Sequence, residues 1–444
     1  MHPSAASETV LLSIKKENVK QVFSMQDNFR RFDMAKRPMR QWLRPVIWAL
    51  SFPAVWKHKA KITKVGMEGI KPPYILLCSH NSFLDFKVVS AAIFPLRSNN
   101  IVAVDGFISP IGRRFISREW LLRLVGCICK RKFTNDITIV RHLKRVAENG
   151  DIAVIYPEAR YSLCGTQSSL PESLGKMCRM FKIPVVTMIT RGHHVTSPFW
   201  NKRERNAVPT EAVMTCIFNA DEIAEADTDQ INEKIAQMFQ YDDFAWQREN
   251  KISVTYKKRA EGLHKVLYQC PACRTEYRIS SAGDRLTCSS CGKSWTMDEY
   301  GTLSADSGGT EYAHIPDWYE WQRSNVREEV LSGKYCFSGA VRVKSLPNSK
   351  GFIDLGEGTL THNSDGFKVA VSGKYGEFEM TKSVRSMYAC HIEYDYLDRY
   401  GDCIDLNTLE DTWYIYPQGS DFAVTKMALA AEELYAGLAG KPPE

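Results

Sequence analysis

Tyr74-Ile75-Leu76-Leu77-Cys78-Ser79-His80-Asn81-Ser82-Phe83-Leu84-Asp85 joins an apolar run to a histidine and an aspartate five positions apart. On an ideal helix five positions turn through about 500°, so two such side chains would point roughly 140° apart. They can meet only if the chain turns between them. The stretch therefore predicts a buried strand over 74–78, a tight turn with Asn81 or Ser82 as N-cap, and a helix from about Phe83.

The predicted turn would bring His80 and Asp85 into an arrangement suited to general-base chemistry. A carboxylate that accepts a hydrogen bond from one ring nitrogen leaves the other nitrogen free to take a proton. We therefore expect His80 to be a catalytic base and Asp85 to orient its ring. A histidine that merely fills a turn is the plainer alternative, because this spacing is common by accident. Cys78 and Ser82 beside His80 raise a third hypothesis, a Cys or Ser nucleophile.

Strand-like and helix-like patterns alternate around this stretch and predict an α/β sheet with helices packed on it. The runs expected to be strands lie at 74–78, 101–104, 152–156, 184–189 and 212–218. The stretches expected to be helices lie at about 83–95, 108–124, 136–148 and 170–182. A further polar helical stretch over about 222–262 is expected to bridge toward the next module.

Four segments of this region follow one another in the order of four sequence blocks of a known enzyme family. They are His80-Asn81-Ser82-Phe83-Leu84-Asp85, Gly126-Cys127-Ile128-Cys129-Lys130-Arg131-Lys132, Tyr156-Pro157-Glu158-Ala159-Arg160-Tyr161-Ser162 and Ile183-Pro184-Val185-Val186. Together, over roughly residues 60–220, they resemble the glycerolipid acyltransferases of the 1-acylglycerol-3-phosphate (lysophosphatidic acid) acyltransferase family. Each block alone is weak, whereas the ordered set is specific.

The resemblance implies transfer of a fatty acyl group from an acyl-CoA or acyl-carrier-protein thioester to the hydroxyl of lysophosphatidate, giving phosphatidate. His80 would remove the hydroxyl proton while Asp85 fixes the ring, and no covalent enzyme intermediate is needed. Backbone amides at the start of the following helix would hold the oxyanion. The resemblance gives Cys78 and Ser82 no role as a nucleophile, which disfavours that hypothesis.

Basic residues of the second and third blocks are the expected phosphate ligands, because a planar guanidinium can donate two parallel hydrogen bonds to a phosphate. The residues expected to bind substrate are Gly126, Arg131, Lys132, Glu158 and Arg160, with Lys130 as a further cation. Glu158 would accept from a substrate hydroxyl or orient an arginine. A solvated basic turn is the alternative for 130–132.

The match departs from the family pattern in its second and third blocks. The family's arginine falls at Lys132, with Arg131 one position early. In the third block Ala159 stands for Gly, Arg160 for Thr and Tyr161 for Arg. These departures leave the acceptor open, and glycerol 3-phosphate or another lysolipid is the alternative to lysophosphatidate.

Cys270-Pro271-Ala272-Cys273 and Cys288-Ser289-Ser290-Cys291 form two Cys-x2-Cys pairs separated by fourteen residues. This spacing suits tetrahedral binding of zinc by thiolates, and four thiolates leave no open position for catalysis. We therefore predict a zinc ribbon over 263–303 with a structural zinc. His193-His194 is expected at the surface or behind the site, because adjacent side chains diverge and would not share a metal.

Beyond the ribbon, short alternating runs separated by Gly, Asn and Asp turns predict a mainly β domain over 313–444. An amphipathic stretch, Phe422–Leu438, predicts a closing helix. Seven or eight strands and one helix resemble a pleckstrin-homology-like barrel in shape. Residues 313–444 carry thirteen Lys and Arg against twenty Asp and Glu, which counts against nucleic acid as a partner.

The front of the chain has the opposite charge: residues 1–64 carry thirteen Lys and Arg against four Asp and Glu. Trp42, Trp48 and Trp56 with flanking basic residues are typical of a segment lying in a membrane interface, and the apolar run is too short to span. A core-packed helix is the alternative. No secretory signal is apparent, so the thirteen cysteines indicate a reducing compartment. We expect a peripheral or monotopic protein on the cytoplasmic side of a membrane.

The sequence thus predicts a membrane-interface segment (1–60), an α/β acyltransferase domain (61–262), a zinc ribbon (263–303) and a barrel-like domain closed by a helix (313–444). The leading function is acyl transfer to lysophosphatidate, and the runner-up changes only the acceptor. A third hypothesis, of another class, is a non-enzymatic lipid-binding or nucleic-acid-binding adaptor, for which the ribbon and the barrel are the only support.

Overall fold

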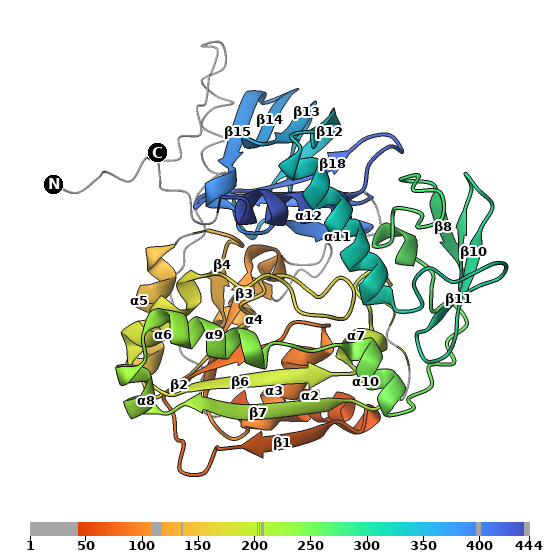
Figure 1. Cartoon of the computed structure of the whole chain (residues 1–444). Coiled ribbons are helices and arrows are strands. Elements are labelled where there is room, and N and C mark those ends of the chain that lie inside the picture. The colour runs from red at the N-terminus through yellow and green to blue at the C-terminus, as the bar shows by residue number, and fades with distance from the viewer. Residues whose placement is uncertain are drawn as a thin grey trace.

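The computed structural model describes residues 43–108, 118–134, 136–201, 203, 205, 208–396 and 401–438. Trp42 and the rest of 1–42 lie outside these residues, so the expectation for the 1–60 segment is followed only from Leu43 onward. Figure 1 shows the described chain as an α/β domain, a sheet-rich C-terminal domain above it and a small four-stranded sheet to one side.

The α/β domain is built on a seven-stranded sheet with the order β1-β7-β6-β2-β5-β3-β4. The strands are β1 (Lys61–Val65), β2 (Tyr74–Cys78), β3 (Ser98–Ala103), β4 (Ile128–Lys130), β5 (Ile152–Ile155), β6 (Val185–Arg191) and β7 (Glu211–Phe218). Neighbouring strands run parallel, except that β6 and β7 are antiparallel. The five strands expected from the sequence are confirmed, and β1 and β4 add the two edges.

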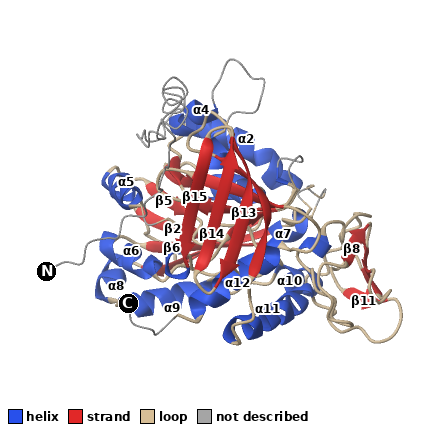
Figure 2. Cartoon of the chain, turned by 90° about the horizontal axis from the view of Figure 1, so that it is seen from above, coloured by secondary structure: helices blue, strands red, loops and turns tan. Residues whose placement is uncertain are grey.

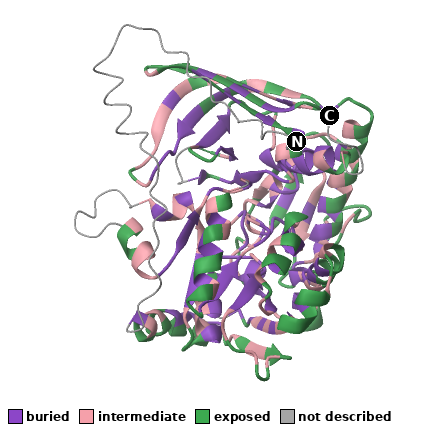
Figure 3. Cartoon of the chain, turned by 90° about the vertical axis from the view of Figure 1, so that its left-hand side faces the viewer, coloured by how far each residue is buried: buried purple, intermediate pink, exposed green. Residues whose placement is uncertain are grey.

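Helices cover both faces of this sheet. They are α2 (Arg44–Lys57), α3 (Leu84–Ile93), α4 (Arg118–Leu124), α5 (Ile137–Glu148), α6 (Ser173–Phe181), α7 (His193–Thr196), α8 (Ala220–Glu225), α9 (Thr228–Met238) and α10 (Asp243–Glu249). Strand β2 is buried along its whole length, as is β5, and Figure 3 shows buried strands in the interior of the α/β domain. Tyr74 and Leu76 pack with α2 and α3, whereas Ile75 and Leu77 pack with α5, α6, α8 and α9. The period-two alternation of a strand therefore produces the two helical layers.

The helical stretch expected over 222–262 is not one helix. It contains α9, α10 and most of α8, and residues 250–262 form turns and coil. Each helix begins at its own N-cap, Asn219, Asp227 or Asp242, whose side chain accepts from first-turn amides. Because these caps divide the stretch, α8 and α9 pack back on the sheet instead of bridging to the next module.

The small sheet holds β8 (Ile279–Ala282), β9 (Arg285–Cys288), β10 (Ser294–Met297) and β11 (Leu303–Ala305) in the antiparallel order β11-β10-β9-β8. Trp295 packs edge-on against Trp318 of α11 (Ile315–Leu331), with ring centroids 5.0 Å apart. Both rings belong to an apolar cluster that continues into the C-terminal sheet. The small sheet therefore shares its core with the larger domain, as its size requires.

The C-terminal domain is a second seven-stranded sheet with the order β15-β14-β13-β12-β18-β17-β16, and its paired strands are antiparallel. Its strands are β12 (Phe337–Ser345), β13 (Ile353–Asn363), β14 (Gly366–Gly373), β15 (Gly376–Ser383), β16 (His391–Glu393), β17 (Cys403–Asn407) and β18 (Thr412–Pro417). The expected closing helix is α12 (Val424–Ala436), which packs into the apolar interior. Helix α11 precedes the first strand of this domain and was not expected from the sequence.

The C-terminal sheet lies over the end of the α/β domain where β4 and β5 finish. Figure 2 looks down through β13, β14 and β15 onto the strands of the α/β sheet. Arg131 and Lys132, directly after β4, and Arg160, a few residues after β5, contact the C-terminal domain. Ligands of α/β proteins collect at the carboxyl ends of the strands, so the upper domain covers the expected place of a site.

Candidate active site

The turn between β2 and α3 brings His80 and Asp85 together. His80 Nδ1 lies 3.2 Å from Asp85 Oδ2. The same oxygen accepts from the backbone amides of Asn81, at 2.7 Å, and Ser82, at 2.9 Å. The Ser82 hydroxyl in turn accepts from the amide of Leu84 at 3.2 Å, although the N-cap of α3 is Phe83 and not Asn81 or Ser82 as expected. One carboxylate thus holds both the turn and the ring.

Asp85 is an anion held between two imidazole rings. Burial alone would raise its pKa, but hydrogen bonds from His193 and His80 outweigh burial and lower the pKa to about 2. Its other oxygen, Oδ1, lies 2.5 Å from His193 Nδ1 and 3.5 Å from the Thr190 hydroxyl. A carboxylate can only accept, so a neutral His80 presents Nδ1–H to it and keeps Nε2 as the basic nitrogen.

The His80 ring is held between two tyrosines and remains 22% exposed. Its centroid lies 4.5 Å from that of Tyr156 and 4.1 Å from that of Tyr161. Its amide donates to Glu158 Oε2 at 2.9 Å, and its carbonyl accepts from the amide of Ser162 at 2.8 Å. The third sequence block therefore positions the histidine of the first.

Glu158 holds backbone rather than substrate, which corrects its expected role. The side chain is fully buried, and Oε1 accepts from the amide of Ser168 at 2.6 Å and from the hydroxyl of Tyr241 at 3.0 Å. Burial raises the pKa of this carboxyl to about 7, although the hydrogen bonds from Ser168 and His80 oppose the shift. Its oxygens fix the loop over 158–168 against His80, so it neither accepts from a substrate hydroxyl nor orients an arginine.

A cavity of about 1480 Å³ lies beside His80. The α/β domain supplies one wall, which includes His80, Phe83 and Tyr161. The C-terminal domain supplies the other, with Tyr388 and Tyr394 among its residues. The site is therefore shared between two domains, which the sequence did not predict.

Arg131 is bound by loops of the C-terminal domain, so its expected phosphate contact is corrected. The guanidinium donates to the carbonyls of Leu346 at 3.0 Å, Pro347 at 2.7 Å and Glu410 at 2.8 Å, and to the Thr412 hydroxyl at 2.6 Å. These four bonds join two domains, and they occupy both terminal nitrogens of the guanidinium that would otherwise bind a phosphate with two parallel hydrogen bonds.

Lys132 lines the cavity but is already paired, so its expected role as a free phosphate ligand is also corrected. Its Nζ lies 3.1 Å from Asp405 Oδ2 and 3.5 Å from Asp105 Oδ2. Burial disfavours the charged amine, yet these two carboxylates outweigh burial and raise the pKa of Lys132. Its charge is neutralised inside the domain interface.

The structure places Arg160 in the interface with the C-terminal domain and not at the expected phosphate site. The side chain is only 3% exposed, and its guanidinium pairs with Glu432 of α12. It also donates to the carbonyl of Cys390 at 3.3 Å. Glu432 is shared with Arg323 of α11, at 2.6 Å. Arg160 thus joins the third block to two C-terminal helices and is not available to a phosphate.

Gly126 and Lys130 complete the second block. Gly126 has a φ of +80°, and its carbonyl accepts from the Asn99 side chain at 2.7 Å, so it shapes the turn before β4. Lys130 ends β4 and lines the cavity. Within the described residues its ammonium makes no hydrogen bond or ion pair, and burial lowers its pKa although Asp136 opposes the shift. Lys130 is therefore the cation of this block with room for an anion.

Cys78 and Ser82 are not arranged as nucleophiles. Burial raises the pKa of the Cys78 thiol well above its usual value, so the thiol stays protonated. Ser82 is buried and its hydroxyl holds the amide of Leu84. The amides of Asn81, Ser82 and Leu84 are occupied inside the turn. Of the amides expected to hold an oxyanion, that of Phe83 remains.

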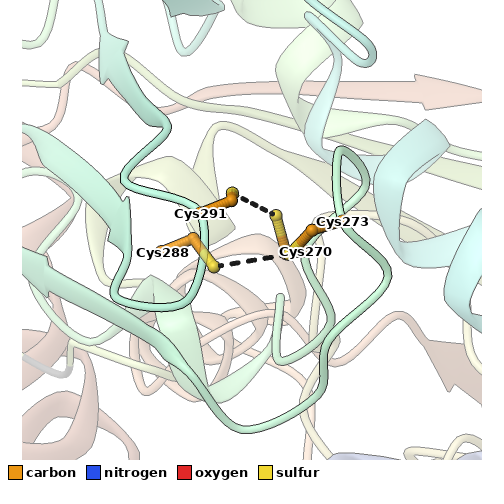
Figure 4. A group of neighbouring side chains, drawn as sticks. All are labelled: Cys270, Cys273, Cys288 and Cys291. Carbon is orange, nitrogen blue, oxygen red and sulfur yellow. Dashed lines mark hydrogen bonds between the residues drawn. The ribbon is translucent and has the colours of Figure 1, made fainter.

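The four cysteines of the small sheet come together as their spacing predicts (Figure 4). Their sulfur atoms all lie within 4.8 Å of one another. Cys270 and Cys291 are 3.8 Å apart, as are Cys273 and Cys288. Four thiols at this separation could hold a metal ion in tetrahedral geometry.

Helix α2 exposes an apolar face beside the α/β sheet. Leu50 and Trp56 are 74% and 77% exposed. Trp48 packs on Phe52 and on Phe94, with centroids 5.0 Å and 5.3 Å apart. Among the described residues, no helix has both the length and the apolar character needed to cross a bilayer.

His193 is the site residue that sequence reasoning placed least well. Both His193 and His194 are fully buried, so of the two expected positions, at the surface or behind the site, the structure places His193 behind the site against Asp85. His194 packs on the rings of Trp200 and Phe244. The available signal was Gly192, which directly follows a buried strand and turns the chain with a φ of +78°.

Comparison with known proteins supports the interpretation of the α/β domain. Residues 59–191 match the family model described as Acyltransferase. No curated protein sequence matches the chain. Among solved structures, the chain is similar to the 1-acyl-sn-glycerophosphate (LPA) acyltransferase PlsC from Thermotoga maritima. That similarity has 13% identity and a TM-score of 0.34, covers 45% of this chain and 77% of that chain, and does not by itself define the fold or the substrate.

The family match and the ordered blocks define the class of protein: residues 59–191 form an acyltransferase domain, and the chain is an acyltransferase enzyme. The acyltransferase domain is joined to a four-cysteine sheet and a C-terminal sheet domain. The match of residues 59–191 counts against the hypothesis of a non-enzymatic adaptor.

Proposed function

We propose that this enzyme transfers a fatty acyl group from an acyl-CoA or acyl-carrier-protein thioester to the hydroxyl of lysophosphatidate, giving phosphatidate. The observation that carries the proposal is the His80–Asp85 hydrogen bond at the wall of a large cavity. A volume of about 1480 Å³ exceeds the ~1,000 Å³ of a large small-molecule pocket, as two lipid-like substrates require.

The chemistry follows from the tautomer that Asp85 imposes. His80 Nε2 takes the proton of the acceptor hydroxyl as its oxygen attacks the thioester carbonyl carbon. A C–O bond forms and the carbonyl oxygen becomes an oxyanion, for which the Phe83 amide at the start of α3 is the candidate donor. Collapse of this intermediate breaks the C–S bond, and the departing thiolate receives the proton from Nε2. Asp85 stabilises the imidazolium throughout.

Lys130 is our candidate contact for the acceptor phosphate. It lines the cavity and makes no hydrogen bond or ion pair among the described residues, whereas Arg131 and Arg160 are occupied in the domain interface. A bound phosphate would favour the charged form of Lys130, which burial disfavours.

The same observation favours a second candidate, acylation of glycerol 3-phosphate or another lysolipid. A single ammonium recognises a phosphate less specifically than a guanidinium that donates two parallel hydrogen bonds. The aromatic wall formed by Tyr388 and Tyr394 would then contribute to the choice of headgroup.

The decisive experiment offers purified protein a panel of lysolipids, glycerol 3-phosphate and acyl thioesters, with products identified by mass spectrometry. His80→Ala should lower turnover roughly 10²–10⁴-fold, and Asp85→Asn should lose less, because the base remains. Unchanged thermal unfolding is the check that His80→Ala still folds. Wild-type turnover by His80→Ala would remove the catalytic assignment.

A second measurement separates the acceptors. Lys130→Gln should raise the apparent KM for phosphate-bearing acceptors and leave phosphate-free lysolipids nearly unaffected. Lys144→Gln is the matched control, because Lys144 is an exposed lysine of the same domain, 3.9 Å from Glu148. A rise in KM on both kinds of acceptor would show that Lys130 does not bind the phosphate.

We also propose that Cys270, Cys273, Cys288 and Cys291 hold one structural zinc. Four thiolates fill a tetrahedral site, so zinc bound there would fasten two turns of the small sheet and take no part in acyl transfer. The distances between the sulfur atoms support this assignment.

For the location we propose the cytoplasmic surface of a membrane, with the 1–60 segment in the interface. The exposed face of α2 supports a lipid surface as its partner, because Trp and Leu flanked by basic residues suit that boundary. Leu50→Ser should weaken binding to vesicles of phosphatidylcholine and phosphatidylglycerol. Leu331→Ser, on α11 and equally exposed at 74%, is the matched control. Equal binding by both variants would remove α2 from the interface.

The domain limits 61–262, 263–303 and 313–444 remain our proposal, as does the pleckstrin-homology-like character of the last. Its support is a seven-stranded antiparallel sheet whose first strand pairs with its last, together with the closing helix α12. We expect no nucleic acid partner, because this domain is acidic.

A further inference from the structure

Asp85 is shared by two histidines that come from opposite ends of the α/β domain sequence. His80 contacts Oδ2 at 3.2 Å, and His193 contacts Oδ1 at 2.5 Å. His80 borders the cavity, whereas His193 is fully buried. The reaction derived above uses His80 and Asp85 and gives His193 no task.

The backbone around His193 allows little movement. Gly192 turns the chain after β6, and a Cβ at this position would lie 2.7 Å from the Trp246 ring and 2.8 Å from the Pro209 carbonyl. The next amide, that of His194, donates to Asp243 of α10 at 2.8 Å. His193 is therefore held in a fixed position behind Asp85.

We propose that His193 is a positioning residue for the acyl transfer proposed above: its Nδ1–H donates to Asp85 Oδ1, fixes that carboxylate and limits how strongly Asp85 can stabilise the His80 imidazolium. The inference rests on the proposed function and adds a residue to it. Two amides and His80 contact Oδ2, and the Thr190 hydroxyl lies 3.5 Å from Oδ1, so His193 at 2.5 Å is the shorter of the two contacts to Oδ1. Each further donor reduces the negative charge that Asp85 presents to His80.

Other titratable groups around Asp85 were considered for the same effect. Those that face it electrostatically are Cys78, Tyr156, Tyr161, Tyr241, His194 and Asp243. Burial raises the pKa of the cysteine and the tyrosines and lowers that of His194 to about 3, so these groups stay neutral near pH 7. Asp243 is the exception, because burial raises its pKa to about 7.

Glu158, bonded to the His80 amide, also has a pKa raised by burial to about 7. A pH profile of turnover would therefore mix three ionisations. The ring of His80 has to be observed directly, by NMR of protein carrying ¹⁵N- and ¹³C-labelled histidine, with His80 and His193 assigned from the spectra of His80→Ala and His193→Asn.

The first readout needs no perturbation. In the wild-type protein, ¹⁵N shifts should show that neutral His80 and neutral His193 both carry their proton on Nδ1. A proton on Nε2 of His193, with Nδ1 unprotonated, would overturn the proposal outright. This result stands even if a variant fails to fold.

The second readout follows the pKa of the His80 ring in variants. His193→Leu removes one donor from Asp85, so the carboxylate stabilises the imidazolium more and the pKa of His80 should rise by about one unit. His193→Asn places an amide donor where Nδ1 was and should restore the wild-type titration. His194→Leu is the matched control: it is the adjacent buried histidine, its ring packs on aromatic neighbours, and it should leave His80 unchanged.

Measurements of turnover then distinguish the proposed acyl transfer from the proposed role of His193. In His193→Leu the acid limb of kcat/KM should move to higher pH by the same amount as the His80 titration followed by NMR, and this agreement separates His80 from the ionisations of Glu158 and Asp243; a merely structural role would lower activity without moving the limb. If no acyl transfer is found while the NMR results hold, the proposed function fails and the hydrogen-bond arrangement stands. If transfer occurs and folded His193→Leu titrates as the wild type does, the role of His193 fails.

Discussion

Glu432→Gln should weaken the contact between the two domains that form the cavity and destabilise the fold, because Glu432 is the shared partner of Arg160 and Arg323. Its side chain is 4% exposed and that of Arg160 is 3% exposed. Breaking a buried ion pair by removing one charge costs about 3–5 kcal/mol, since the other charge stays buried and unpaired. Arg160 keeps its bond to the Cys390 carbonyl, and glutamine keeps an acceptor oxygen, so we expect about 3 kcal/mol.

The neighbouring residue is the control. Glu433 is also buried, with its side chain 6% exposed, and it lies 3.4 Å from Arg323, but its nearer partner, Arg327 at 2.7 Å, is 55% exposed, so water replaces the lost carboxylate at Arg327. Glu433→Gln should therefore cost at most about 1 kcal/mol. Urea unfolding followed by tryptophan fluorescence, with the two variants compared at the midpoint of the same transition, measures the difference.

Two results would refute this reasoning. Equal losses in Glu432→Gln and Glu433→Gln would mean that the Arg160 pair is no stronger than a surface pair. A rise in KM for phosphate-bearing acceptors alone in Arg160→Lys would mean that Arg160 contacts the phosphate after all. We expect Arg160→Lys to change KM by the same factor on phosphate-bearing and phosphate-free acceptors, because it loosens the shared cavity.

Three further predictions concern other parts of the chain. Freshly purified protein should contain about one zinc per molecule, and Cys288→Ser should lower that content and expose the small sheet to proteolysis; a zinc-free preparation would contradict the assignment. Ala159→Gly should stabilise the fold slightly, because the φ of +54° costs alanine about 1–2 kcal/mol while glycine loses about 0.4–1 kcal/mol through the unfolded chain; lower stability would show that the turn is not strained. Finally, burial raises the pKa of Glu158 from its ordinary 4.5 to about 7 in the folded state. The folded state therefore binds the Glu158 proton more tightly than the unfolded state does. The stability that this proton contributes is lost as the pH rises from about 4.5 toward 7. Glu158→Gln should flatten the fall in unfolding free energy between these pH values, and an unchanged slope would contradict the burial argument.

Local signals in the sequence were sufficient for five of the seven strands of the α/β sheet. The apolar run 74–78 and the periodic stretch 136–148 each became the expected element, because neighbours along the chain determine both burial on a strand and the face of a helix. The two Cys-x2-Cys pairs meet because the β8–β9 hairpin between them brings the two turns together. Helix α11 was missed although Ile315, Trp318, Tyr319, Gln322 and Val326 recur at helical spacing, because its polar residues mask the pattern.

The sequence by itself determined which residues meet locally: His80 with Asp85 across one turn, and the cysteine pairs across short loops. Only the tertiary structure decided what the basic residues do. The sequence predicts Arg131, Lys132 and Arg160 as phosphate ligands. In the structure, each is bound by C-terminal-domain residues that lie 215 to 281 positions away along the chain. A guanidinium or an ammonium attracts any carboxylate or carbonyl brought within reach, so its partner is set by which domains pack together and not by its own neighbours in the chain. The same holds for His193, which reaches Asp85 across 108 positions because β6 and β2 lie side by side.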